Sequence, residues 1–88
     1  MDINLDGLAM DSRKAAHDHL LERFGFPAYY GRNLDALYDL LTEVRTPTRI
    51  SLLHKNAMLQ ALGTYGNALI ECFEQAEAEN PSIEFHIL

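Results

Sequence analysis

Polar and apolar residues alternate near both ends of the chain, the pattern of β-strands that bury one face. Near the start, Ile3 and Leu5 alternate with polar residues across positions 2–6, and a glycine follows. Near the end, positions 82–88 alternate in the same way. A third segment, 48–53, follows a proline in the middle of the chain. The sequence therefore predicts three short strands.

Two segments between the first two strands carry apolar residues at the three- and four-residue spacing of an α-helix. The first helix is expected to begin at a cap supplied by Asp11 or Ser12 and to end near Phe24, because Gly25 follows. The second is expected to begin after Asn33, a favourable N-cap residue. The apolar residues of this second helix share one face: Leu34, Leu37, Leu41 and Val44.

Two further helices are expected after the middle strand, at about 55–62 and 67–79, with a turn at 63–66 between them. Strands that are separated by helices need crossover connections and therefore run parallel. The expected fold is α/β, with a three-stranded parallel sheet packed against about four helices. A chain of 88 residues is too short for two cores, so we expect one domain, 1–88.

The charge of the chain narrows its possible partners. Thirteen acidic residues oppose seven Lys and Arg, which gives a net charge of −6. Nucleic-acid phosphates are bound by Lys and Arg, so we expect no direct contact with nucleic acid. A negative field instead accelerates association with a basic protein.

The sequence also indicates the location of the protein in the cell. No segment near the N-terminus has the basic start and apolar run of a signal peptide, and none reaches the roughly 18 apolar residues that span a membrane. The single cysteine, Cys72, cannot form a disulfide within the chain. We therefore expect a soluble, cytoplasmic protein that makes no contact with a membrane.

Two histidines, His17 and His19, suggest a metal site until they are placed on the first helix. Residues two apart diverge by about 200° there, so the two rings cannot bind one ion. His17 lies beside the apolar face and is expected to be a partly buried structural residue, and Cys72 a small buried one. No phosphate-binding loop, nucleophile elbow or zinc spacing occurs. We therefore expect that the protein is not an enzyme and binds no metal or cofactor. A metal-dependent enzyme built on His17 and His19 is the least favoured of the hypotheses.

The second helix has an outward face opposite its leucines. This face carries Asp35, Tyr38, Asp39 and Thr42 and lies next to the Tyr29-Tyr30 loop. A tyrosine between carboxylates is typical of a protein interface. From the pattern alone, an ordinary solvated helix face is the favoured explanation of the same residues.

The segment Pro27–Thr42, PAYYGRNLDALYDLLT, resembles the barstar family of intracellular ribonuclease inhibitors. The length, the acidic charge and the strand–helix layout are similar to that family too. The resemblance implies a bacterial inhibitor of immunity or antitoxin type, whose second helix and preceding loop block the active site of a basic ribonuclease or nuclease toxin domain. It implies a monomer that forms a 1:1 complex.

The resemblance also implies roles for individual residues. Asp39 is expected to be the central phosphate mimic and Asp35 the second acidic contact. Tyr29 is expected to supply aromatic packing, with Tyr30 behind or beside it. The other expected partner-binding residues shape the entry to the helix or border the interface: Gly31, Asn33, Tyr38, Thr42 and Glu43.

Four positions depart from the best-known member of that family. Tyr38 stands where it has tryptophan, Glu43-Val44 where it has Gly-Trp, and Gln75 where it has a carboxylate. These positions lie at or near the expected contact surface, so they bear on which nuclease is the target. The alternative is a binding module of the same fold for another basic protein, without nuclease inhibition.

Overall fold

The computed structural model describes all 88 residues, Met1–Leu88. The elements follow in the order β1 (Asp2–Asp6), a 3-10 turn η1 (Gly7–Ala9), α1 (Arg13–Phe24), α2 (Leu34–Thr42), β2 (Thr48–Leu53), α3 (Lys55–Leu62), α4 (Thr64–Glu79) and β3 (Ile83–Ile87). No helix combines the length and apolar character needed to cross a membrane.

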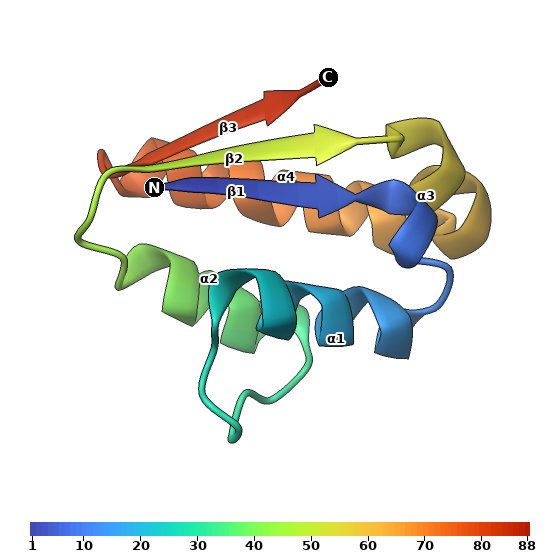
Figure 1. Cartoon of the computed structure of the whole chain (residues 1–88), viewed down its shortest axis with the longest axis horizontal. Coiled ribbons are helices and arrows are strands. Elements are labelled where there is room, and N and C mark those ends of the chain that lie inside the picture. The colour runs from blue at the N-terminus through green and yellow to red at the C-terminus, as the bar shows by residue number, and fades with distance from the viewer.

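The three strands form one parallel sheet in the order β1-β2-β3 (Figure 1). The register sets Ile3 of β1 opposite Ile50 of β2, which in turn lies opposite Phe85 of β3. The predicted α/β fold, with a three-stranded parallel sheet and four α-helices, is confirmed. The order of the strands follows the order of the chain.

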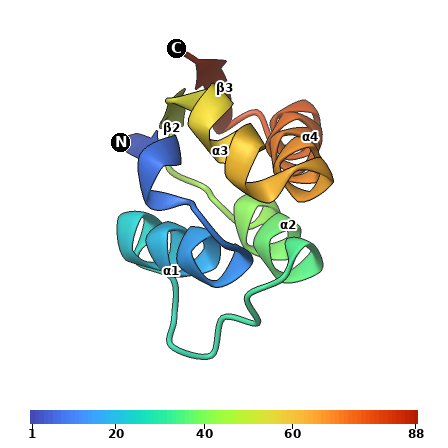
Figure 2. The same ribbon diagram turned by 90° about the vertical axis from the view of Figure 1, so that its right-hand side faces the viewer.

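The helices cover one face of the sheet only (Figure 2). Ile3, Leu5 and Ile50 point toward the helices and are buried. Their neighbours in the strands, such as Arg49 and Glu84, point to the opposite face, where they are exposed and form an ion pair of 3.3 Å. One face of the sheet is therefore open and polar, and the core lies between the other face and the helices.

The predicted ends of α1 and the predicted start of α2 are confirmed, but α2 ends at Thr42, so Val44, expected on its apolar face, lies beyond the helix. The Ser12 hydroxyl accepts a hydrogen bond from the Ala15 N–H at the start of α1, and Gly25 ends that helix with φ 69°. The Asn33 side-chain oxygen accepts from the Ala36 N–H at 2.7 Å and caps α2. These caps set the limits of the loop between the two helices, which projects from the molecule in both views (Figures 1 and 2).

The predicted turn at 63–66 is wrong, because α4 already begins at Thr64. Gly63, with φ 60°, is the single residue that separates α3 from α4. Gly66 is buried within α4, where a Cβ would lie 3.0 Å from the Cδ2 atom of Leu59. A glycine that resembles a turn residue in the sequence instead lets two helices approach closely.

Side chains of the helices satisfy outward backbone groups at both edges of the sheet. At β1, His19 Nε2 accepts from the Asp6 N–H at 3.0 Å and Arg23 Nε donates to the Asn4 carbonyl at 2.9 Å. At β3, a carboxylate oxygen of Glu77 accepts from the Phe85 N–H at 2.8 Å. These bonds protect edges that would otherwise offer free donors and acceptors to another strand.

Candidate protein-binding surface

The helix α2 buries one side and exposes the other, as the pattern predicts. Leu37 and Leu41 are fully buried, whereas Asp35, Asp39 and Glu43 are exposed. The carboxylates of these three acids take part in none of the ion pairs or side-chain hydrogen bonds of the protein, unlike those of other acids such as Asp18 and Glu84. Their negative charge is therefore free to meet a partner.

The C-terminal end of α2 is held by a residue that the sequence did not single out for this role. Asn80, which follows α4 and is buried, donates 2.9 Å hydrogen bonds to the carbonyls of Leu41 and Val44. In the sequence Asn80 only marks the end of a helix, and nothing there shows that it reaches residues more than thirty positions away. The bonds fasten the last turn of α2 and the residues that follow it to the end of α4.

The two adjacent tyrosines of the loop point in opposite directions. Tyr29 is 85% exposed, the most exposed of the large apolar or aromatic side chains, whereas Tyr30 is 4% exposed. The Tyr30 ring packs against Phe26, and its hydroxyl lies 2.6 Å from Nδ1 of His17. Tyr29 thus offers surface to a partner, and Tyr30 is the buried residue behind it that fixes the loop to the core.

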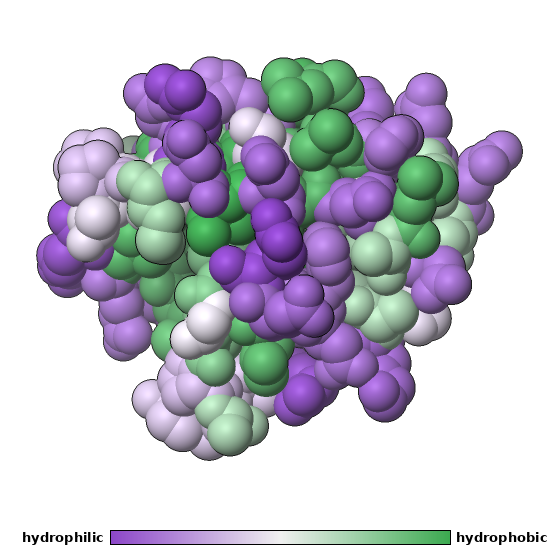
Figure 3. Space-filling model, viewed as in Figure 1, coloured by the Kyte–Doolittle hydropathy of each residue, from purple (hydrophilic) through white to green (hydrophobic).

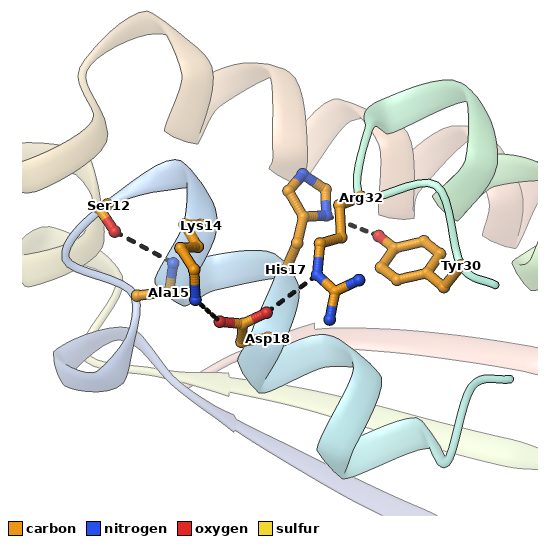
Figure 4. A network of polar contacts seen from close by, with 7 residues as sticks. All are labelled: Ser12, Lys14, Ala15, His17, Asp18, Tyr30 and Arg32. Carbon is orange, nitrogen blue, oxygen red and sulfur yellow. Dashed lines mark hydrogen bonds and ion pairs between the residues drawn. The ribbon is translucent and has the colours of Figure 1, made fainter. Parts of the chain in front are cut away.

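His17, on α1, joins the loop to α4 as well, and Figure 4 shows its contact with Tyr30 of the loop. Its Nδ1 faces the Tyr30 hydroxyl, and its Nε2 lies 2.6 Å from the hydroxyl of Tyr65 on α4. Burial lowers the pKa of His17, so the ring is neutral at pH 7, with one nitrogen donating and the other accepting. The expected structural role of His17 is confirmed, and its burial is nearly complete.

The two histidines of α1 lie in separate environments. His19 accepts a backbone hydrogen bond at the edge of β1, away from the tyrosines around His17. No group of three His, Cys, Asp or Glu side chains has a geometry that could hold a metal ion. Cys72 is buried behind α2, where its Sγ lies 3.7 Å from the Leu34 carbonyl and burial raises its pKa to about 11. The expectation of a small, buried side chain is confirmed.

The loop and the helix together border a shallow depression of about 270 Å³. Tyr29 lies on the loop side, and Asp39 and Glu43 lie on the helix side. The remaining lining residues are Tyr30, Gly31, Ala36 and Leu40. Figure 3 shows the loop as a projection of weakly hydrophilic and apolar residues at the lower edge of the molecule, below a surface rich in hydrophilic side chains.

The other predicted site residues lie around this depression in different settings. Asp35 and Asn33 line a second depression, at the N-terminal end of α2. The Thr42 hydroxyl donates to the Asp39 carbonyl at 2.9 Å, within the helix. Tyr38, expected to be exposed, is half-buried because its ring packs against the core; Gln75 is exposed on α4.

The fold and this surface together define a small α/β protein with an acidic and aromatic binding face. A family model described as "Barstar (barnase inhibitor)" matches residues 1–88. A protein of Bacillus subtilis (strain 168) named "Putative ribonuclease inhibitor YrdF" is 37% identical over 78 residues, covering 88% of this chain and 86% of that protein. The chain belongs to the barstar family. Membership of a family of inhibitors confirms the expectation that the chain is not an enzyme.

Proposed function

We propose that this member of the barstar family inhibits a basic ribonuclease by covering its active site with the exposed side of α2 and the Tyr29 loop. The observation that supports this mechanism most directly is the set of three exposed carboxylates without partners, Asp35, Asp39 and Glu43. Asp39 and Glu43 border the same depression as Tyr29, a large exposed aromatic side chain.

Electrostatics gives this surface a reason to bind a ribonuclease cleft. A ribonuclease holds RNA phosphates with cationic side chains, so carboxylates on a rigid helix compete for the same groups. Asp39 is the central phosphate mimic in the proposal, and Asp35 is the second. Removing one partner of such a desolvated pair costs about 2–5 kcal/mol or more, a range that draws on the barnase–barstar complex itself.

The other residues of the surface have supporting roles in the proposal. Tyr29 packs against the nuclease, while Tyr30 holds the loop from behind through His17. Gly31 and Asn33 shape the entry to α2, Tyr38 borders the interface, and Thr42 and Glu43 complete its helical side. On this proposal a monomer forms a 1:1 complex inside the cell that makes the nuclease, as an immunity or antitoxin protein.

The test is an RNA-cleavage assay with barnase and a panel of small basic ribonucleases and nuclease toxin domains. Each nuclease is titrated with the protein, and binding is measured in parallel by calorimetry. Complete inhibition of at least one nuclease at a 1:1 ratio is the expected result. Binding to a nuclease without loss of cleavage would contradict the proposal and favour a binding module for another purpose.

A further inference from the structure

A basic group of side chains adjoins the acidic face of α2. Arg13, Lys14 and Arg32 line the second depression, of about 490 Å³, together with Asn33 and Asp35. These are three of only seven Lys and Arg in a chain of net charge −6. Because Asn33 and Asp35 belong to the proposed interface, the basic group is continuous with it.

Arg32 is oriented by a carboxylate on α1 (Figure 4). Its Nε donates to one oxygen of Asp18 at 3.0 Å, and the other oxygen accepts from Lys14 at 2.7 Å. These hydrogen bonds, first from Lys14 and then from Arg32, hold the pKa of Asp18 below its usual value, so the carboxylate stays charged. Asp18 therefore fixes Arg32 through one nitrogen only.

The two terminal nitrogens of Arg32 have no hydrogen-bond partner in the protein, and Figure 4 shows them directed away from Asp18. The side chain is 45% exposed, so this end of the guanidinium group is accessible. The other guanidinium group of the depression, that of Arg13, lies 4.3 Å from the centre of the Tyr65 ring. Arg32 is thus the guanidinium group of the depression that has both an orienting carboxylate and a free pair of terminal nitrogens.

The backbone of Arg32 adds an independent observation. Its φ is 52°, in the left-handed region that glycine adopts freely and that a residue with a Cβ adopts at a cost. Arg32 lies between Gly31 and Asn33, at the entry to the interface helix. Strained residues of this kind concentrate at functional sites.

We propose that Arg32 binds a carboxylate of the target nuclease, beside the cationic cleft that receives Asp35 and Asp39. The inference rests on the proposed function and extends it to the choice of target. A guanidinium group binds a carboxylate through two parallel hydrogen bonds, and its two free terminal nitrogens have that geometry. The anion is a protein side chain and not an RNA phosphate, because the net charge of −6 repels nucleic acid.

In this contact the inhibitor supplies the positive charge and the nuclease the negative one, the reverse of the contacts of Asp35 and Asp39. The contact therefore influences which nuclease is bound. A nuclease with an acidic residue at this place gains an ion pair, whereas one with a basic residue there meets Arg32 as a like charge. Arg32 would thus distinguish between nucleases whose catalytic clefts are equally cationic.

The test measures the inhibition constant for a nuclease that the unchanged protein inhibits, beginning with barnase. Arg32→Gly should weaken inhibition by about tenfold or more, the scale of a lost charge-assisted pair of hydrogen bonds. Its melting temperature should not fall, because glycine accepts the left-handed backbone. Arg32→Glu should weaken inhibition further. Arg49→Gln, which removes a paired arginine from the open face of the sheet, is the control and should have no effect.

A second arm identifies the partner group. Each surface Asp and Glu of the nuclease is changed singly to Ala. For one of these nuclease variants, the unchanged inhibitor and Arg32→Gly should have the same inhibition constant. Inhibition that stays within twofold for Arg32→Gly and Arg32→Glu, while Asp39→Ala abolishes it, would overturn this inference alone. An equal loss of inhibition in Arg49→Gln would overturn it, because the effect would then not depend on where the arginine lies. Failure of the unchanged protein to inhibit any nuclease would overturn the proposed function first.

Discussion

His17 is the single residue on which the position of the binding loop depends most. Its two ring nitrogens bond to tyrosines from different parts of the chain, Tyr30 in the loop and Tyr65 on α4. Such a buried network stabilises one arrangement of the loop as long as every member keeps its partner. Tyr29, the residue before Tyr30, is exposed beside this network.

The burial of histidine predicts how stability depends on pH. Burial lowers the pKa values of His17 and His19 below the 6.5 of a free histidine. Above pH 6.5 these residues are neutral in both states, so they leave the stability unchanged. Below it the unfolded chain takes up protons that the folded chain does not, so the free energy of unfolding falls as the pH falls. Urea unfolding between about pH 7.5 and 5 measures this slope, and His17→Gln should reduce it.

Carboxylates make the free energy of unfolding depend on pH in a different, more acidic range. The pKa values of Asp6, Asp18 and Glu84 are lowered by hydrogen bonds, so their contribution is present above pH 4.5 and is lost only in more acidic solution. A slope between pH 6.5 and 5 that is the same in His17→Gln as in the unchanged protein would contradict the role given to His17.

Individual contacts could be predicted only where they are local. The caps at Ser12 and Asn33 lie within three residues of their partners, so sequence spacing was sufficient. The structural role of His17 could be predicted from its helix face, but its partner Tyr65 lies 48 residues away and has no local signal. The burial of Tyr30 against exposed Tyr29 likewise depends on packing with distant residues.

Among the elements, α2 is held at both ends by asparagine side chains. Asn33 caps its first turn, and Asn80 bonds the last carbonyls. Asn33→Ala should lower the free energy of unfolding by about 1 kcal/mol, because the Ala36 N–H loses its partner. Asn33→Ser keeps an N-cap oxygen and should retain most of the stability. Equal losses in the two variants, measured by urea unfolding, would show that the N-cap hydrogen bond is not the source of the lost stability.

The turn η1 requires glycine at its first position. A Cβ on Gly7 would lie 2.1 Å from the carbonyl oxygen of His54, a backbone atom that cannot rotate away. Gly7→Ala should therefore destabilise the fold by about 1–3 kcal/mol or more, as overpacking does. Gly25→Ala meets nothing within 4 Å and should cost about 1 kcal/mol through its φ of 69° alone. A smaller loss for Gly7→Ala than for Gly25→Ala in thermal unfolding would contradict this account.

Most elements could be predicted, and the one clear error has a physical cause. Alternation and helical spacing predicted β1, β2, α1 and α3 with the right limits because each has one buried face. The start of α4 was missed because Gly63 and Gly66 resemble a turn pair. Only the close approach of Gly66 to Leu59, a tertiary contact, shows that the second glycine belongs to the helix.

In the molecule as a whole, charge has an uneven distribution. The net charge of −6 steers the protein toward a basic partner, and the free carboxylates of α2 lie on the face expected to meet it. The association rate with an inhibited ribonuclease should fall by about tenfold or more as salt rises from about 25 to 500 mM, because ions screen this attraction. Stopped-flow measurements test this, and a rate that does not change with salt would contradict electrostatic steering.

The account depends on the position of the carboxylates and not only on their number. Asp39 and Asp2 are both exposed, but Asp39 lies on the side of α2 proposed to bind the nuclease and Asp2 on β1 at the open face of the sheet. Asp39→Ala and Asp2→Ala change the net charge equally, and neither residue forms an ion pair within the protein.

The most direct measurement is therefore the inhibition constant of these two variants against the same ribonuclease, with melting temperatures as a check on folding. Asp39→Ala should weaken inhibition by about a hundredfold or more at an unchanged melting temperature, and Asp2→Ala should inhibit as the unchanged protein does. Equal inhibition by the two variants, or a loss in Asp39→Ala that only follows a loss of stability, would contradict the proposal that α2 blocks the active site.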